Sequence, residues 1–158
     1  WQPIAWGLRG FGRFPARGRP RVLWIGIDGA AALIDLAEQI DQALGDRARI
    51  RRYAHVSLPM DEALAVCSLD ISGRPFCRFE SALPPVTIAG YEAELTEEFF
   101  RAVAINAKLT LHLSNPYGSN AHHMIEACFK AFGRALRDAV SIDPGETGVP
   151  STKGTLSG

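Results

Sequence analysis

Two adjacent histidines and a glutamate, His122, His123 and Glu126, form the pattern in this sequence most suited to metal chemistry. On a helix, His122 and Glu126 lie one turn apart and project from the same side, and His123 is three residues from Glu126. Imidazole nitrogens and a carboxylate oxygen are ligands that zinc, manganese and iron accept. The pattern therefore predicts half of a divalent-metal site at a helix start. The alternative is a solvated polar cluster, because the spacing leaves the remaining ligands unassigned.

Two adjacent carboxylates, Asp61 and Glu62, precede a predicted strand and form a second candidate group. Such a pair can hold a metal ion or transfer protons in general acid–base catalysis. A solvated strand entrance is the simpler explanation when the pair is taken alone. His112, on the polar face of another predicted strand, is open to both interpretations.

Arginine, lysine and hydroxyl side chains form a third candidate group, which consists of Arg52, Arg74 and the segment Ser151-Thr152-Lys153-Gly154. Guanidinium forks, an ammonium group and hydroxyls are what a phosphate monoester requires. Because these residues are scattered through the sequence, solvation explains each of them separately.

Three amphipathic helices are predicted from apolar residues that recur at three- and four-residue steps. The first covers 30–44 and ends at Gly45, and the second covers 94–108. The third and longest covers 121–140, with Asn120 as its N-cap. The predicted core stripe of the second helix is Leu95, Phe99, Val103 and Ala107, and that of the third is Ile125, Phe129, Phe132, Leu136 and Val140.

Strands are predicted where apolar and polar residues alternate or where a short apolar run is bounded by turns. Val22–Ile25 is typical of a buried strand, and Val56–Leu58 of a short strand that Pro59 stops. In the run 110–114, Leu111 and Leu113 are expected to face inward.

A hairpin is predicted from an alternating strand over 65–71, a turn at 72–75 and a returning strand over 76–80. Residues 82–90 and 115–120 read as loops, and the part from Asp143 onward as an extended tail. Helices combined with an antiparallel hairpin indicate an α+β fold.

Composition excludes several classes of protein. The chain has 158 residues, 17 Lys+Arg against 17 Asp+Glu, and 47% hydrophobic residues, as in an ordinary globular domain. Zero net charge argues against a general nucleic-acid binder. No apolar run is long enough to span a membrane. Three widely spaced cysteines without a Cys-x-x-Cys pair argue against a disulfide framework and favour the cytoplasm.

The first part of the chain differs from the rest. Up to Ile27 it contains five arginines and no acidic residue, and it holds all three tryptophans. It lacks both an initiator methionine and the charged start and apolar block of a signal peptide, which suggests a fragment or a processed chain.

Several motifs in register resemble the imidazoleglycerol-phosphate dehydratase family, a lyase family of histidine biosynthesis. The resemblance covers about residues 45–156. The motifs that carry it are Ala43-Leu-Gly-Asp46, Ile50-Arg-Arg52, Pro59-Met-Asp-Glu-Ala-Leu64, Asp70-Ile-Ser-Gly-Arg-Pro75, Glu97-Glu-Phe-Phe100, Leu109-Thr-Leu-His112, Asn120-Ala-His-His-Met-Ile-Glu126, Phe129-Lys-Ala-Phe132 and Pro150-Ser-Thr-Lys-Gly154.

The resemblance implies an α+β fold built as a tandem repeat of two halves, each a four-stranded sheet with helices, of the ribosomal protein S5 domain 2-like type. It also implies a homo-oligomer of 24 subunits with active sites where subunits meet. For this chain we expect an atypical segment over 1–29, a remnant of the first half and the start of the second over 30–85, and the second half over 86–156.

The resemblance further implies two Mn²⁺ ions per active site, held by a His-His-x-x-Glu motif from each half. His122, His123 and Glu126 match the second motif, and Glu98 occupies the position where many members have a further ligand histidine. The positions that match the phosphate-binding residues of the family are Arg52, Arg74, Ser151 and Lys153, with Lys130 close by.

The reaction implied is the dehydration of D-erythro-imidazole glycerol phosphate, a phosphorylated imidazole, to imidazole acetol phosphate. The metals would act as Lewis acids, and Glu126, His122 and Glu62 are the expected catalytic residues. Neither nucleic acid nor membrane is expected as a partner.

The sequence departs from the family where the first metal motif should lie. Residues 26–30 read Gly-Ile-Asp-Gly-Ala there, and no histidine precedes His55. We expect a truncated or frame-shifted version of an active enzyme. The ratio of 14 arginines to three lysines is consistent with a GC-rich gene, in which an out-of-frame stretch tends to encode Arg, Gly, Ala and Pro. The alternatives are a degenerate, non-catalytic homologue that keeps fold, assembly and phosphate binding, and a natural N-terminal arm with another role.

Overall fold

The computed structural model describes most of the chain from residue 38 onward and two short strands before it. The described ranges are 11–14, 22–25, 38, 40–42, 44–152 and 154–156, with the backbone alone described in the first two.

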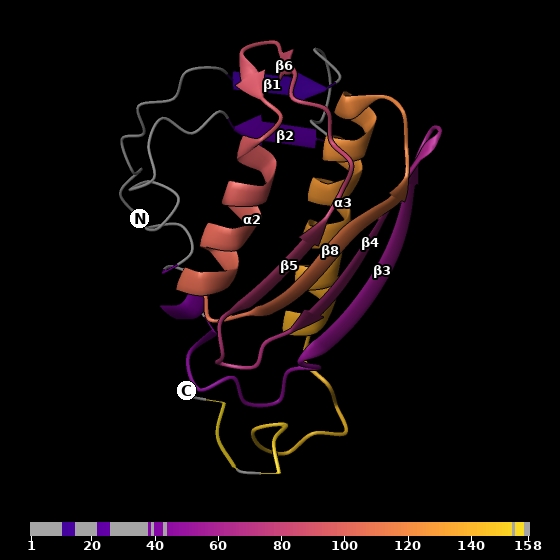
Figure 1. The fold of residues 1–158 in the computed structure, drawn as a ribbon. Coiled ribbons are helices and arrows are strands. Elements are labelled where there is room, and N and C mark those ends of the chain that lie inside the picture. The colour runs from indigo at the N-terminus through magenta and orange to yellow at the C-terminus, as the bar shows by residue number, and fades with distance from the viewer. Residues whose placement is uncertain are drawn as a thin grey trace.

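A four-stranded sheet forms the centre of the fold, in the order β3-β4-β8-β5 (Figure 1). Its strands are β3 (Tyr53–Met60), β4 (Ala63–Asp70), β5 (Phe76–Glu80) and β8 (Thr110–Tyr117). β4 pairs antiparallel with both β3 and β8, whereas β5 pairs parallel with β8. The α+β fold predicted from the sequence is confirmed.

Two helices, α2 (Leu95–Asn106) and α3 (Ala121–Val140), pack on one face of this sheet. α3 lies against β3 and β4, and α2 lies against β5. The fully buried side chains of Phe100, Leu111 and Leu113 belong to the core between the layers. The other face of the sheet carries the alternate residues of each strand, which are more exposed.

Small residues bring α3 close to the sheet. Its contact face is centred on side chains that are fully buried, namely Ala127, Cys128, Ala131, Ala135 and Ala139. Of the predicted stripe, Ile125 and Phe132 are buried, and Phe129, Leu136 and Val140 are half-buried at the side of the core. The predicted stripe therefore lies to one side of the observed contact face, because it was defined by the large apolar residues and omitted the alanines.

The same shift occurs on α2, where Leu95 was expected in the core and is 47% exposed. The buried face of α2 consists of Thr96, Phe100, Val103 and Ala104. Thr96 tolerates burial because its hydroxyl lies 3.0 Å from the hydroxyl of Tyr91.

The predicted hairpin of residues 65–80 is wrong in its pairing, although both of its strands exist. β8 lies between β4 and β5, so the turn at 72–75 connects strands that do not pair. The hairpin of this sheet is β3–β4, which turns at Asp61 and Glu62.

Pro59 does not stop its strand as predicted, since β3 continues to Met60 and pairs Pro59 with Leu64. β3 is an edge strand, where a residue without a backbone N–H costs no ladder hydrogen bond on the open side. Similarly, β8 extends to Tyr117, through part of the segment predicted as the loop 115–120.

Four short strands form two antiparallel ribbons outside the main sheet. β1 (Phe11–Phe14) pairs with β2 (Val22–Ile25), which confirms the strand predicted there. β6 (Thr87–Ile88) lies inside the predicted loop 82–90 and pairs with β7 (Tyr91–Glu92), which follows that loop directly. Within the predicted helix 30–44, residues 38, 40–42 and 44 are helical, and the chain turns at Gly45.

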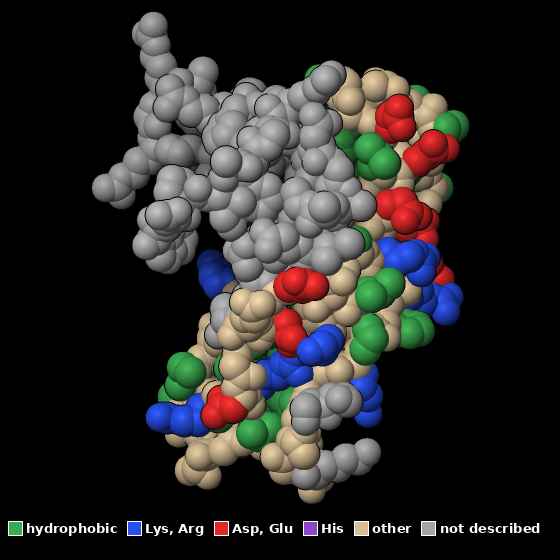
Figure 2. All heavy atoms as spheres, turned by 90° about the vertical axis from the view of Figure 1, so that its left-hand side faces the viewer, with side chains coloured by type: hydrophobic (Ala, Val, Ile, Leu, Met, Phe, Trp, Pro, Cys, Tyr) green, Lys and Arg blue, Asp and Glu red, His purple; other side chains and the backbone are tan. Residues whose placement is uncertain are grey.

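On the described part of the face in Figure 2, acidic side chains gather at the upper right, and acidic and basic side chains are mixed below them, with hydrophobic side chains between. Within the described part of the chain, no helix is long and apolar enough to cross a membrane. The absence of a nucleic-acid partner stays a prediction from the net charge.

Candidate functional site

The first turn of α3 holds the predicted metal ligands in place. Asn120 adopts an extended conformation, and its side chain accepts hydrogen bonds from the backbone N–H groups of His122 and His123, at 2.9 and 3.3 Å. The cap predicted from the sequence is confirmed, and it satisfies donors that have no partner within the helix. The two imidazoles therefore start from a fixed backbone.

His122, Glu126 and Lys130 form a row along one side of α3, each one turn from the next. His122 Nε2 lies 3.1 Å from Glu126 Oε2, and Lys130 Nζ lies 2.6 Å from Glu126 Oε1. Glu126 thus has a different partner on each of its two oxygens, which fixes the plane of its carboxylate.

Glu62 connects the β3–β4 turn to the start of α3. Its Oε2 lies 2.6 Å from Nδ1 of His123. Its Oε1 accepts hydrogen bonds from the backbone N–H groups of Asn120, at 2.7 Å, and Ser119, at 3.2 Å. The bond to His123, followed by the bond from Asn120, lowers the pKa of Glu62 to about 2. The same pair raises the pKa of His123.

Asp61, the neighbour of Glu62, lies at the tip of the β3–β4 turn. Its backbone has a φ of +48°, a left-handed conformation that is uncommon for a residue with a side chain. Its Oδ2 lies 3.6 Å from His123 Nε2, and its side chain is 71% exposed. The structure therefore places Asp61 and Glu62, the second candidate group, next to His123 of the first group. From the sequence, the two groups were predicted separately.

The donors in this region divide into two sets. The centroids of the His122 and His123 rings are 6.0 Å apart, and each ring is next to a different carboxylate. Among the residues that the structure describes, no group of three His, Cys, Asp or Glu side chains is arranged to hold a metal ion. Imidazole and carboxylate are suitable donors for a divalent first-row metal, but each set supplies only part of a coordination sphere.

Glu98, the fourth predicted ligand, lies on α2 and is exposed. Its charge acts on Arg101 of the same helix. Within the described residues, no ion pair or hydrogen bond links Glu98 to the histidines of α3.

At the opposite end of the sheet, Arg52 precedes β3 and pairs with Asp70 at the end of β4. Arg52 Nε donates to Asp70 Oδ1 at 2.7 Å, and Nη2 donates to Oδ2 at 3.1 Å. This hydrogen-bonded pairing, which outweighs the effect of burial, raises the pKa of Arg52. Nη1 donates to the carbonyl oxygen of Pro150 at 2.7 Å.

Arg74 lies in the turn that follows β4, and its side chain is exposed. Ser72 supports the backbone of this turn, because its hydroxyl accepts from the N–H of Arg74 at 3.0 Å and lies 2.8 Å from the hydroxyl of Thr110. Ser72 is 5% exposed. Arg52 and Arg74 are thus held at the same end of the sheet by separate contacts.

The predicted tail residues follow Pro150 directly. Ser151 is half-buried, and its carbonyl accepts from the N–H of Gly154 at 3.0 Å. Lys153 lies outside the described residues.

The candidate residues lie at two opposite ends of the sheet. In Figure 1, the β3–β4 turn and the start of α3 are at the top, and the tail is at the bottom. The eight residues of β3 separate Arg52 from Asp61, which corresponds to roughly 25 Å at the rise of a β-strand. Lys130, predicted close to the phosphate group, lies beside Glu126 within the single chain. Helical spacing of four residues from Glu126 was the signal for this position.

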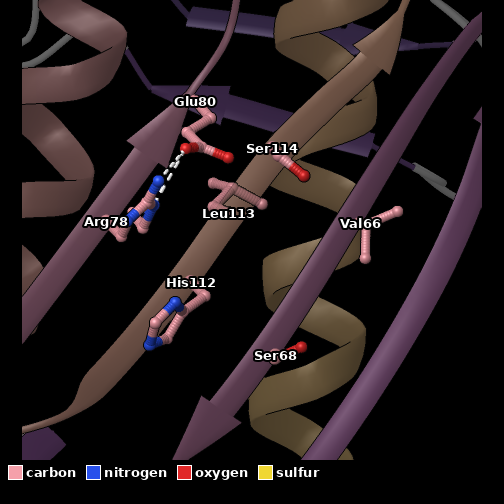
Figure 3. A pocket seen from close by; sticks show the side chains of 7 residues that line it. All are labelled: Val66, Ser68, Arg78, Glu80, His112, Leu113 and Ser114. Carbon is pink, nitrogen blue, oxygen red and sulfur yellow. Dashed lines mark hydrogen bonds and ion pairs between the residues drawn. The ribbon is translucent and has the colours of Figure 1, made fainter.

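A shallow depression on the outer face of the sheet contains His112 and none of the residues predicted to bind metal or phosphate (Figure 3). Arg78 and Glu80 of β5 pair with each other at its rim. The ring of His112 lies 5.3 Å from that of Phe76. His112 is an exposed side chain that lines this depression.

Comparison with known proteins identifies the relatives of this chain. A family model described as imidazoleglycerol-phosphate dehydratase matches residues 31–136. The imidazoleglycerol-phosphate dehydratase of Symbiobacterium thermophilum is 54% identical over 123 residues, which are 78% of this chain and 59% of that protein. That of Lactococcus lactis subsp. cremoris is 53% identical over 78% of this chain and 63% of that protein.

Solved structures agree with these matches. The imidazoleglycerol-phosphate dehydratase of Staphylococcus aureus superposes with a TM-score of 0.67 and 42% identity, covering 73% of this chain and 70% of that one. The enzyme from Pyrococcus furiosus, in complex with (S)-C348, gives a TM-score of 0.67 and 32% identity over 82% and 73% of the two chains. This chain spans about three fifths of the length of the first two curated relatives. The chain belongs to the imidazoleglycerol-phosphate dehydratase family.

Proposed function

We propose that this chain takes part in the dehydration of D-erythro-imidazole glycerol phosphate to imidazole acetol phosphate, a lyase reaction of histidine biosynthesis. Family membership supports the reaction. The His–carboxylate cluster on α3 supports metal assistance, and the arginines at the other end of the sheet support a phosphorylated substrate. A cytoplasmic location stays a prediction from the three free cysteines.

The observation that carries this proposal is the separation of the two groups within one chain. Arg52 donates its backbone N–H to the carbonyl of Ala139, and Glu126 lies 13 residues before Ala139 on α3, which corresponds to roughly 20 Å at the rise of an α-helix. A small phosphorylated imidazole cannot reach both. We therefore infer that the metal end of one copy meets the arginine end of another in a homo-oligomer. The family resemblance implies 24 subunits.

Two donor sets would hold the metal, for which we propose Mn²⁺. One consists of His122 and Glu126, and the other is His123, whose Nε2 is available because Nδ1 faces Glu62. Glu98 is proposed as a further ligand, contributed across a contact between copies. A bound divalent ion would supply a positive charge that makes the substrate imidazole and its neighbouring carbon more acidic.

The side chains around these donors would bind the substrate and move protons. Glu126 is the carboxylate proposed to take up and return a proton at the substrate imidazole. Glu62, whose pKa is lowered to about 2, would contribute by holding His123 in place. Lys130 pairs with Oε1 of Glu126, which leaves Oε2 directed at His122. His122 is 60% exposed at its side chain and is therefore accessible to substrate.

The phosphate would be bound at the other end by Arg52, Arg74, Ser151 and Lys153. The described guanidinium of Arg52 still has N–H groups beyond those given to Asp70 and Pro150. In an assembled site, Lys130 of one copy would approach the same phosphate from the metal side.

A direct assay tests the proposal. The purified chain is incubated with imidazole glycerol phosphate, with Mn²⁺ and with a chelator, and imidazole acetol phosphate is measured. We expect product only with Mn²⁺, and none from a His122→Ala variant. No product from the unaltered chain with Mn²⁺ would contradict the proposed activity.

Mixing variants tests whether the site is shared between copies. His122→Ala and Arg52→Ala each remove one end of the site, so each variant alone should be inactive. Mixed oligomers contain some contacts in which both ends are intact, and these should regain activity. Mixed oligomers, verified by mass, that stay inactive would place the complete site within one chain.

A non-catalytic homologue is the second candidate, and one observation favours it. Residues 26–30 lack the histidines of the first family motif. Such a protein would assemble and bind phosphate, yet show no turnover with added manganese.

A further inference from the structure

The tail after α3 returns along the segment that precedes β3. Three backbone hydrogen bonds join the two, and they connect Arg49 N to Gly148 O, Asp143 N to Arg49 O, and Arg51 N to Ser141 O, while a fourth connects Arg52 N to Ala139 O in the last turn of α3. All four fall before Pro150. The part of the tail that carries Ser151 therefore depends on other contacts for its position.

Arg52 supplies the contact at Pro150, and Asp70 determines how Arg52 is oriented. Asp70 accepts from two nitrogens of the guanidinium, while the third nitrogen donates to the carbonyl of Pro150, 98 residues away in sequence. The ring of Tyr53 lies 4.5 Å from the guanidinium carbon. A carboxylate at one edge, a carbonyl at another and a ring on one face leave the guanidinium a single orientation.

Burial makes this arrangement more than a surface ion pair. The side chains of Arg52 and Asp70 are 11% and 17% exposed, whereas those of Arg78 and Glu80, a comparable pair on β5, are 62% and 58% exposed. Of the five guanidinium N–H groups, Asp70 and Pro150 take three. One N–H on each terminal nitrogen stays available to an anion.

We propose that Asp70 is a positioning residue of the phosphate site. By holding Arg52, Asp70 directs the two remaining guanidinium N–H groups and, through Pro150, places the adjacent Ser151 beside them. The inference rests on the proposed function, in which this end of the sheet binds the substrate phosphate. Asp70 itself does not touch the anion.

Charge and position predict opposite effects for the loss of this carboxylate. A negative charge beside an anion site repels phosphate, so its removal alone would strengthen phosphate binding. If Asp70 acts by positioning, its removal frees Arg52 and the tail, and phosphate binding weakens. The sign of the change therefore separates the two roles.

The experiment compares Asp70→Asn with Glu80→Gln in the full chain. Glu80→Gln is the matched control, because it also removes one negative charge from a carboxylate paired with an arginine of this sheet. Binding of inorganic phosphate is measured by calorimetry, and hydrogen exchange over residues 144–156 by mass spectrometry. We expect Asp70→Asn to weaken phosphate binding about tenfold and to speed exchange in the tail, and Glu80→Gln to change neither.

Unchanged or tighter phosphate binding by folded Asp70→Asn would overturn the proposal, as would the absence of phosphate binding by the unaltered chain. A purely structural role would lower the melting temperature and leave the phosphate affinity of the folded protein unchanged.

If Asp70→Asn does not fold, Arg52→Lys decides, because it keeps the positive charge and loses the two-pronged guanidinium geometry. Faster tail exchange in Arg52→Lys supports positioning, and unchanged exchange overturns it. Because neither measurement needs turnover, an inactive chain that binds phosphate would contradict the proposed activity and not the role of Asp70.

Discussion

Glu62 Oε2 lies 2.6 Å from Nδ1 of His123, across the junction between the β3–β4 turn and the first turn of α3. A histidine that binds a metal through one ring nitrogen is commonly oriented by a hydrogen bond at the other. Glu62 occupies that place and is itself fixed by the backbone N–H groups of Ser119 and Asn120. The turn and the helix start therefore form one unit that presents Nε2 of His123.

Replacing Glu62 by Gln should weaken metal binding about 10- to 100-fold, the range observed when such a supporting contact is lost. The amide can donate to Nδ1, which favours the tautomer with a proton on Nε2, the nitrogen that would bind the metal. Titration with Mn²⁺, followed by the EPR signal of the free ion, measures the change. Glu80→Gln is the control for the loss of one charge. Equal affinity in Glu62→Gln and the unaltered chain would show that Glu62 does not support a ligand.

Removing the ligand histidines one at a time should lower the metal content stepwise. His122→Ala leaves His123 with Glu62, so we expect reduced but measurable Mn²⁺, and the double variant at both histidines should bind none. His112→Ala is the control, since that exposed ring lies on the outer face of the sheet. Metal analysis after dialysis provides the readout. If His122→Ala kept its full metal content, His122 would not be a ligand.

Features set by near neighbours in sequence were predictable, and features set by distant pairing were not. Asn120 and the residues after it define α3 from its cap to its end, because capping and helical spacing act within a few residues. The place of β8 between β4 and β5 depends on segments about 40 residues apart, and no local pattern encodes it.

The same distinction applies to the candidate site. The contact between Glu62 and His123 joins residues 61 positions apart, and only the fold brings them together. The distance between Arg52 and Glu126 was equally unpredictable from the sequence. Residue type indicates that a cation can bind phosphate, but not where in the fold that cation lies. The ion pair of Lys130 with Glu126 was predictable from their distance of four residues on a helix, but Lys130 was assigned only to the phosphate group.

Gly73→Ala should destabilise the chain more than Gly45→Ala. Both glycines have positive φ, +73° and +52°, so each substitution introduces backbone strain of about 1–2 kcal/mol. A Cβ at Gly73 would also overlap the carbonyl oxygen of Leu156, whereas one at Gly45 would meet no atom within 4 Å. The tail must therefore shift in Gly73→Ala alone. Urea denaturation measures the difference, which we expect to exceed about 1 kcal/mol. Equal losses of unfolding free energy would mean that the tail does not pack on Gly73.

The three free cysteines should react with thiol reagents in a defined order. Burial raises the pKa of Cys67 and of Cys128 to about 12, and it also raises the pKa of Cys77, which is half-buried. The thiolate is the reactive form, and the unfolded chain forms it near an ordinary pKa of about 8.5. At pH 8, we therefore expect Cys77 to be alkylated first, and Cys67 and Cys128 only when the protein unfolds.

Because both pKa values are higher in the folded state, the associated stabilisation is complete below the unfolded pKa and is lost as the pH rises toward 12. Raising the pH from 7 to 10 should therefore lower the free energy of unfolding and speed labelling of Cys67 and Cys128. Pulsed alkylation with peptide mass mapping measures each cysteine separately, and labelling in urea gives the unprotected reference rate. Labelling of Cys128 as fast as Cys77 in the folded protein would contradict the packing of α3 against the sheet, because Cys128 lies at the centre of that contact.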